Sequence, residues 1–218
     1  MVERESLHRE AETFFERMWQ CGDPWEFERS EFEQAKYARL LALLAGRRYP
    51  RVLELGCGAG AFTRLLAPLA DEVLALDVSP AAITRARALG PGPAVVDFRQ
   101  ANVMAYNPHT EGPWDLVVIS DTMCYLGWLY SFFDVSWFAR ELFAATRDNG
   151  HCLFANTMGE IGDMLMLPWL IRTYRDLFLN VGYCLETEDI FRGTKHGITI
   201  EVLMSLFIKA PAVARSDV

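Results

Sequence analysis

A glycine-rich segment directly after an apolar run is the feature that most restricts the fold of this chain. Residues 52–62 read Val-Leu-Glu-Leu-Gly-Cys-Gly-Ala-Gly-Ala-Phe, an expected strand, a G-x-G-x-G loop and the start of a helix. Glycines allow a sharp turn and a close approach of the backbone to a ligand. In open α/β sheets, ligands bind at the carboxyl ends of such strands. The segment therefore predicts an α/β sheet with a binding site above its first strand.

Short apolar runs alternate with helix-like stretches after residue 49, a pattern typical of a parallel sheet with helices on both faces. We expect parallel strands at Arg51–Leu55, Glu72–Leu76, Val95–Arg99, Leu116–Ser120 and His151–Asn156. The helices that connect and follow them are expected at Thr63–Leu69, Pro80–Leu89, Val135–Thr146 and Pro168–Leu179. Two last strand-like runs, Tyr183–Phe191 and Ile198–Ile208, flank a glycine-containing loop at 192–197 and predict an antiparallel pair.

Two amphipathic helices are expected before the sheet. Glu5–Trp19 and Ser30–Leu44 carry apolar residues at helical spacing, and these apolar faces need a partner to be buried. We therefore expect residues 1–48 to form an N-terminal helical cap or lid and residues 49–210 to form one α/β domain. The small and polar residues 211–218 are expected to be a frayed tail. A length of 218 residues agrees with one domain and such a cap.

Composition limits the partners that we expect. Acidic residues outnumber basic ones by 29 to 21, and a net charge of −8 repels phosphate backbones and anionic lipids. Neither nucleic acid nor a membrane is therefore expected as a partner, and a homodimer is left open. The five cysteines are scattered and form no C-x-x-C, so we expect a cytoplasmic protein without a disulfide framework or a metal site. The first residues lack the apolar core of a secretory signal.

Glu54 lies two residues before Gly56 and helps to decide between ligands. A dinucleotide site uses the spacing G-x-G-x-x-G and offers amides to a pyrophosphate. Here Gly56, Gly58 and Gly60 give the spacing G-x-G-x-G around Cys57, and a carboxylate at Glu54 would repel phosphate. A ligand with an ammonium or sulfonium group and no phosphate fits better. We therefore expect S-adenosylmethionine as the cofactor.

Residues after the next two strands complete the expected cofactor site. Asp77, followed by Val78, lies about 20 residues after the loop, where an acid can accept both hydroxyls of a ribose. Asn102 can hydrogen-bond an adenine edge, and Val103 can supply an apolar face. Taken singly, the glycines indicate a tight turn, Asp77 a helix cap and Asn102 a turn. Their order and spacing together favour the cofactor.

These motifs resemble the class I methyltransferases, through the glycine loop, Asp77, Asn102 and the Trp-Asp-Leu-Val run at 114–117 before Ser120 and Asp121. The resemblance implies a Rossmann-like, mostly parallel sheet of seven strands whose last strand is antiparallel. Ser120, which follows the fourth strand beside the switch point of the sheet, is counted among the expected cofactor contacts.

Three further segments resemble the NodS family of nodulation N-methyltransferases and its natural-product relatives. They are Asp-Pro-Trp at 23–25, Glu-Gln-x-Lys-Tyr at 33–37 and Ile-Arg-Thr-Tyr-Arg-Asp-Leu at 171–177. This resemblance implies methyl transfer from S-adenosylmethionine to a small molecule, which in nodulation proteins is an amino sugar. Trp25 is counted among the expected cofactor contacts. The chain departs from the family at Asp121, where we expect Glu, and this leaves the acceptor open.

The segment after the fourth strand is expected to face the methyl acceptor. Asp121 and Tyr125 are the expected catalytic residues, Asp121 to orient an amine and Tyr125 to form a wall of the pocket. An alcohol acceptor would need a base such as His, and none of the four histidines has an obvious place there. An amine is therefore expected first and an alcohol second. A cap of the following helix by Asp121, a protein substrate and a non-catalytic S-adenosylmethionine-binding domain are the alternatives.

Overall fold

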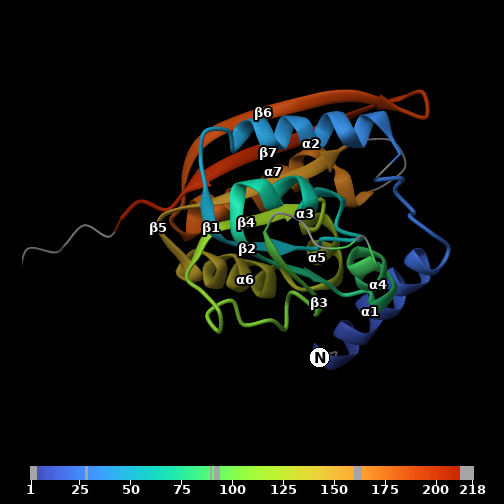
Figure 1. Ribbon diagram of the computed structural model, residues 1–218, viewed down its shortest axis with the longest axis horizontal. Coiled ribbons are helices and arrows are strands. Elements are labelled where there is room, and N and C mark those ends of the chain that lie inside the picture. The colour runs from blue at the N-terminus through green and yellow to red at the C-terminus, as the bar shows by residue number, and fades with distance from the viewer. Residues whose placement is uncertain (1–3, 28, 89, 91–93, 160–163, 212–218) are drawn as a thin grey trace, which may run out of the picture.

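A seven-stranded sheet with the order β3-β2-β1-β4-β5-β7-β6 forms the centre of the protein (Figure 1). The computed structural model describes residues 4–27, 29–88, 90, 94–159 and 164–211. Five neighbouring strands pair in parallel, and β7 pairs antiparallel with both β5 and β6. The expected Rossmann-like sheet, mostly parallel with an antiparallel last strand, is confirmed.

The strands occupy the expected places, with small differences at their ends. They are β1 (Tyr49–Leu55), β2 (Ala70–Asp77), β3 (Val95–Gln100), β4 (Trp114–Ser120), β5 (Thr146–Met158), β6 (Cys184–Lys195) and β7 (Ile198–Ile208). The central strands are buried at nearly every residue, because helices cover both faces of the sheet. Alternate side chains of β1 therefore enter two different apolar clusters.

The turn between β6 and β7 is shorter than the sequence predicts. Lys195 pairs with Ile198, so only His196 and Gly197 lie between the strands, and the expected loop at 192–197 is wrong. His196 and Gly197 have φ values of 51° and 76°, as a two-residue turn of type I′ requires. The strand pairing continues to this turn and places Lys195 within β6.

The helices are α1 (Arg4–Gln20), α2 (Glu31–Leu43), α3 (Ala61–Leu66), α4 (Pro80–Ala88), α5 (Met123–Leu129), α6 (Phe132–Ala145) and α7 (Pro168–Val181), with 3₁₀ turns η1 (Ala67–Leu69) and η2 (Met164–Met166). No bounds were predicted for α5, although a helix after Asp121 is part of the alternative in which this residue is a helix cap. The Cys124 amide near its start donates to the Asn156 Oδ1 of β5, 3.2 Å away. Because this cap comes from a distant strand, the local sequence carries no signal for the helix.

The two N-terminal helices pack in different places. α2 lies along β6 and β7, and it buries Phe32, Tyr37 and Leu40 in the cluster on one face of the sheet (Figure 1). α1 packs against α4, and its Trp19 belongs to a separate small cluster. The two helices of the expected cap therefore pack separately. α2 is part of the helical layer that covers the sheet, and α1 packs against α4.

No helix within the described ranges has both the length and the apolar character that crossing a bilayer requires. The expected frayed tail at 211–218 lies outside the described residues except for Pro211.

Candidate functional site

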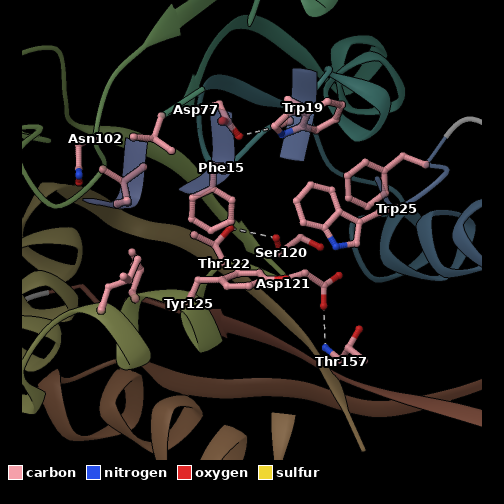
Figure 2. Close-up of a pocket in the computed structure, with 18 of the residues that line it drawn as sticks. Phe15, Trp19, Trp25, Asp77, Asn102, Ser120, Asp121, Thr122, Tyr125 and Thr157 are labelled. Atoms are coloured by element: carbon pink, nitrogen blue, oxygen red, sulfur yellow. Dashed lines mark hydrogen bonds between the residues drawn. The ribbon is translucent and has the colours of Figure 1, made fainter. Parts of the chain in front are cut away.

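A pocket lies at the carboxyl ends of β1, β2, β3 and β4, where open α/β sheets bind ligands (Figure 2). Its empty volume is about 910 Å³, which includes part of its open mouth. The expected residues that line it are Trp25, Gly56, Gly58, Asp77, Val78, Asn102, Val103, Ser120, Asp121 and Tyr125. Glu54, Cys57 and Gly60 are not among the lining residues. The structure thus brings most of the sequence-predicted site residues around one cavity.

Gly56 and Gly58 shape the floor of the pocket. Both have positive φ values, 80° and 53°, which side chains of L-residues rarely adopt. A Cβ on Gly56 would lie 2.2 Å from the Thr122 Oγ1, and one on Gly58 would lie 2.9 Å from the Trp19 ring. The Gly56 amide donates to the Leu76 carbonyl at the end of β2. Both glycines are therefore needed for the turn and for close packing against α1 and the Thr122 segment.

Glu54 lies behind the glycine loop, away from the lining of the pocket. The residue is 3% exposed, and burial raises the pKa of its carboxyl to about 8. The Thr63 hydroxyl opposes this rise in pKa and the charge of Asp77 adds to it. At neutral pH the group is therefore largely protonated. Glu54 is not among the residues that line the pocket, and its expected contact with the cofactor stays a prediction.

Asp77 ends β2 at the wall of the pocket and fixes the glycine loop. Its Oδ2 accepts the Gly58 amide at 2.8 Å, and its Oδ1 accepts the Ser79 amide at 2.9 Å. Burial raises the pKa of Asp77, while these amide hydrogen bonds lower it. The Ser79 hydroxyl caps α4 through the Ala82 amide. Asp77 is therefore held in place next to the helix entry and also faces the cavity.

Asn102 forms the turn that its position after β3 suggests. Its Oδ1 accepts the Met104 amide at 2.9 Å, and its Nδ2 donates to the Tyr130 hydroxyl at 2.8 Å. Asn102, Val103 and Tyr130 all line the pocket. The turn therefore also fixes a part of the pocket wall.

Aromatic side chains close one side of the cavity (Figure 2). Trp25 lies 5.7 Å from Trp19 and 5.5 Å from Phe27 between ring centroids, and Phe15 meets Tyr125 edge-on at 5.0 Å. From the sequence we expected Trp25 and Tyr125 at the site and weighed Phe27 as a pocket aromatic, but Phe15 and Trp19 were not expected there. The apolar spacing of α1 shows which residues need burial, but it does not show which surface they cover.

Asp121 lies directly after β4, with a φ of 50°. Its Oδ1 accepts the Thr157 amide at 2.7 Å (Figure 2). Its Oδ2 accepts a hydrogen bond from the Lys36 Nζ at 2.7 Å. Burial alone would raise the pKa of Asp121, but the charge of Lys36 and these hydrogen bonds outweigh it and lower the pKa. Asp121 is not the N-cap of the following helix, because Thr122 is the N-cap of α5.

A buried charge cluster beside Asp121 was missed by the sequence analysis. The Lys36 Nζ lies 2.5 Å from the Glu33 Oε2, and the Lys195 Nζ lies 2.9 Å from the Glu33 Oε1. Glu33 and Lys36 line the pocket, and both are buried. A signal existed, since Glu33 and Lys36 occupy the same stripe of α2 as its buried residues Phe32 and Leu40. Charged residues inside an apolar stripe indicate a buried ion pair.

Comparison with known proteins identifies the family. A family model described as Nodulation protein S (NodS) matches residues 8–156, more than half of the chain. The chain belongs to the NodS family. The matched range includes the NodS-like segments at 23–25 and 33–37, Asp77 at the end of β2 and Asp121 directly after β4. The resemblance that the motifs indicated is confirmed.

Individual NodS relatives agree with this family membership. Nodulation protein S of Rhizobium tropici is 37% identical over 106 residues, which are 48% of this chain and 44% of that protein. Nodulation protein S of Bradyrhizobium diazoefficiens is 34% identical over 120 residues, 54% of this chain and 56% of that protein. The matching part of the chain thus spans about half the length of these curated relatives.

A solved NodS structure has the same fold. It is N-methyltransferase NodS from Bradyrhizobium japonicum WM9, in complex with S-adenosyl-L-homocysteine. It aligns with a TM-score of 0.74 and 21% sequence identity, and the alignment covers 91% of this chain and 98% of that one.

Proposed function

We propose that this NodS-family protein transfers a methyl group from S-adenosylmethionine to a small-molecule amine. The observation that carries the proposal is that one cavity joins the glycine loop and Asp77 to the carboxylate of Asp121. Family membership supports the reaction class, because the solved relative from B. japonicum is described as an N-methyltransferase and contains S-adenosyl-L-homocysteine.

The residues around Asp77 fit this cofactor. Each oxygen of the Asp77 carboxylate accepts one backbone amide, and a carboxylate oxygen can accept two hydrogen bonds. One acceptor position on each oxygen is therefore left for a ribose hydroxyl. We assign the remaining contacts to Trp25, Gly56, Gly58, Val78, Asn102, Val103 and Ser120, all of which line the pocket. Cys57 and Gly60 shape the loop, and Glu54 supports it from behind.

The protein contributes alignment and the exclusion of water. S-adenosylmethionine supplies a methyl group on a positively charged sulfur when it is bound. The lone pair of the acceptor nitrogen forms the new N–C bond, the electrons of the C–S bond stay on sulfur, and the methylated ammonium later releases its proton to solvent. Phe15, Trp19 and Trp25 form apolar walls that keep the reacting atoms dry. Asp121 accepts a hydrogen bond from the amine and thereby orients its lone pair.

The lining of the pocket favours an amine over an alcohol. An alcohol needs a strong base close to its hydroxyl, most often His, and no histidine is among the described residues that line the pocket. His151 instead lies beside Glu186, at the other end of the sheet strands. A carboxylate such as Asp121 can orient an amine without acting as a strong base. An O-directed transfer therefore remains the second candidate.

Mass spectrometry after incubation with S-adenosylmethionine tests the proposal. Panels of small amines and alcohols are offered, and we expect amines to gain the mass of one methyl group. Methylation of alcohols alone would favour an O-methyltransferase. Binding of S-adenosylmethionine without turnover on either panel would favour a non-catalytic binding domain.

The substitution Asp121→Asn tests the acceptor role of this residue. It nearly preserves shape but removes the charge, so turnover on the amine should fall at least about tenfold while cofactor affinity holds. Asp189→Asn is the matched control, because Asp189 pairs with Arg39 outside the pocket. If the melting temperature falls and turnover does not, Asp121 has only a structural role.

A further inference from the structure

Four charged side chains from three segments meet at one place beside the pocket. Lys36 of α2 lies 2.7 Å from the Asp121 Oδ2 and 2.5 Å from the Glu33 Oε2. Lys195 of β6 donates to the Glu33 Oε1 at 2.9 Å and to the Trp25 carbonyl at 2.5 Å. Two carboxylates and two ammonium groups give the cluster a formal charge of zero. Glu33, Lys36 and Asp121 all line the cavity.

Burying these charged groups costs the folded state free energy. Lys36 is 2% exposed and Glu33 is 5% exposed, so both have lost their hydration. Buried ion pairs of this kind rarely add net stability relative to apolar residues of similar size. The neighbouring positions of the same helix face, Phe32, Tyr37 and Leu40, are already apolar, and two more apolar residues would fit the pattern. Stability alone therefore does not explain these charges, and Glu33, Lys36 and Asp121 all face the pocket.

We propose that Lys36 is a positioning residue that holds the Asp121 carboxylate ionised and aimed at the methyl acceptor. This inference rests on the proposed function, because it concerns the residue that orients the amine. It assigns a role in that site to α2, which packs against β6 and β7.

The geometry around Asp121 supports this assignment. The Thr157 amide holds Oδ1 at 2.7 Å and Lys36 holds Oδ2 at 2.7 Å, so rotation of the carboxylate would break one of the two bonds. The Thr157 side chain also hydrogen-bonds this carboxylate, and one of its roughly four acceptor positions is left for an N–H of the substrate. Lys36 pairs with both Asp121 and Glu33, and Lys195 also pairs with Glu33. The two ammonium groups thus balance the two carboxylates, and the cluster has no excess negative charge. A neutral amine, the form that carries the reactive lone pair, therefore suits the site.

The charged and titratable groups that face Asp121 come from every element packed around it. α2 supplies Glu33, Lys36 and Tyr37, and Lys195 of β6 acts through Glu33. α5 supplies the Cys124 thiol, which contacts the Asp121 backbone carbonyl. Burial would raise the pKa of Asp121, and the charge of Lys36 is the largest of the influences that lower it. Without Lys36, Asp121 should be protonated over a wider pH range and accept the amine less often.

Three variants test the proposal. Lys36→Met removes the charge, and Lys36→Arg keeps it and should retain most of the activity. Lys209→Met is the matched control, because Lys209 is a mostly buried lysine that donates to the carbonyls of Phe143 and Thr146 outside the pocket. If Lys36→Met does not fold, the double variant Lys36→Met/Glu33→Gln removes one carboxylate as well and keeps the cluster neutral.

The first readout does not depend on turnover. The pKa of Asp121 is measured by NMR titration of ¹³C-labelled aspartate carboxyls, with Asp121→Asn to assign the signal. Lys36→Met should raise this pKa by about 1 to 3 pH units, whereas Lys36→Arg and Lys209→Met should leave it near the wild-type value. An unchanged pKa in Lys36→Met would overturn the role of Lys36, whatever the protein methylates.

The second readout is the ratio of the variant's kcat to that of the wild type across pH, because ionisation of the amine cancels in this ratio. For Lys36→Met the ratio should be at least tenfold below one at neutral pH and should rise with pH, as Asp121 loses its proton. For Lys209→Met it should not change with pH. A low ratio that is constant with pH would make Lys36 merely structural. If the wild type methylates no amine, the proposed function fails, and the NMR titration still decides the role of Lys36.

Discussion

At the scale of single residues, Asp77 carries the strongest prediction about the cofactor. Asp77→Ala removes the acceptor proposed for two ribose hydroxyls, and each lost hydrogen bond to a charged group should cost about 1.5 to 3 kcal/mol. Binding of S-adenosylhomocysteine, measured by calorimetry, should weaken at least about tenfold. The fold should also lose some stability, because the Gly58 and Ser79 amides lose their acceptor.

Asp97→Ala is the matched control for this measurement, since Asp97 is an exposed aspartate of β3 that pairs with Arg99 outside the pocket. Its affinity for S-adenosylhomocysteine should equal that of the wild type. Equal affinity for Asp77→Ala and the wild type would remove the basis for placing the ribose at Asp77.

Single residues also show how far the sequence can locate such a site. Asp77, Asn102 and Asp121 could be placed because each lies at or just after the end of a parallel strand, and such strands end at one edge of the sheet. Phe15 and Lys36 could not be placed, because they arrive from helices whose partners the local pattern does not specify. These two contacts are set by tertiary packing.

At the scale of elements, α1 is held over the pocket by an acidic side chain. The Glu16 Oε2 accepts the Ser79 hydroxyl at 2.6 Å and the Ala81 amide at 3.0 Å, at the start of α4. A carboxylate is stabilised at a helix N-terminus. The hydrogen bond from Ser79 is the main reason why the pKa of Glu16 lies below the ordinary value of a glutamate. Glu16 therefore connects α1 to the start of α4, and we call this contact the latch.

This latch predicts how the protection of α1 depends on pH. A carboxyl whose pKa is lowered by folding stabilises the folded state above its unfolded pKa, and this stabilisation is lost as the pH falls through the folded pKa. The protection factors of the amides of residues 11–19 against hydrogen exchange should therefore be constant from neutral pH to about pH 5 and should fall below about pH 4. Glu16→Gln should reduce the protection about two- to fivefold at neutral pH.

The control for the latch is Glu10→Gln, because Glu10 is an exposed residue of α1 that bonds only locally, to Ser6. S-adenosylhomocysteine should increase the protection of α1 if this helix covers the cofactor. Identical exchange with and without the ligand would refute a ligand-linked cover.

A close contact between α5 and α7 gives a prediction about stability. A Cβ on Gly127 would lie 1.9 Å from the Tyr174 hydroxyl, which is far inside van der Waals contact. Gly127→Ala should therefore lower the free energy of unfolding by about 1 to 3 kcal/mol, measured by urea denaturation. Gly159→Ala is the control, because nothing lies within 4 Å of its added Cβ. Equal stability of the two variants would show that α5 and α7 can move apart without a loss in the free energy of unfolding.

The elements differ in how well the sequence predicts them. Strands such as β4 were predicted because long apolar runs bounded by polar residues are distinctive. The bounds of α5 were not predicted, because the Asn156 side chain that accepts one of its first amides comes from β5. The β6–β7 turn was predicted too long, because a His-Gly turn does not stand out beside Gly193, which lies within the paired part of β6.

At the scale of the whole molecule, burial is divided among three clusters. One cluster lies between the sheet and α5, α6 and α7, and a second lies between the sheet and α2, α3 and α4. Trp19 of α1 joins Ala59 and Ala82 in a third, much smaller cluster. This division follows from alternate side chains of the strands pointing to opposite faces. It was predictable in outline from the alternation of strands and helices, whereas the separation of α1 from α2 was not.

The three clusters predict that α1 and α2 respond differently to truncation. A variant that lacks residues 1–22 loses only the contacts of α1, with Trp19 as its main buried side chain, so it should lose about 2 to 4 kcal/mol and still unfold cooperatively. A variant that lacks residues 1–45 also loses Phe32, Tyr37, Leu40 and Leu44 from the second cluster and should not fold. Circular dichroism and thermal unfolding distinguish these outcomes. The shorter truncation should also weaken S-adenosylhomocysteine binding, because Phe15 and Trp19 line the pocket. If both truncations fold equally well, α2 is not part of the core, and its Lys36 cannot be a fixed support for Asp121.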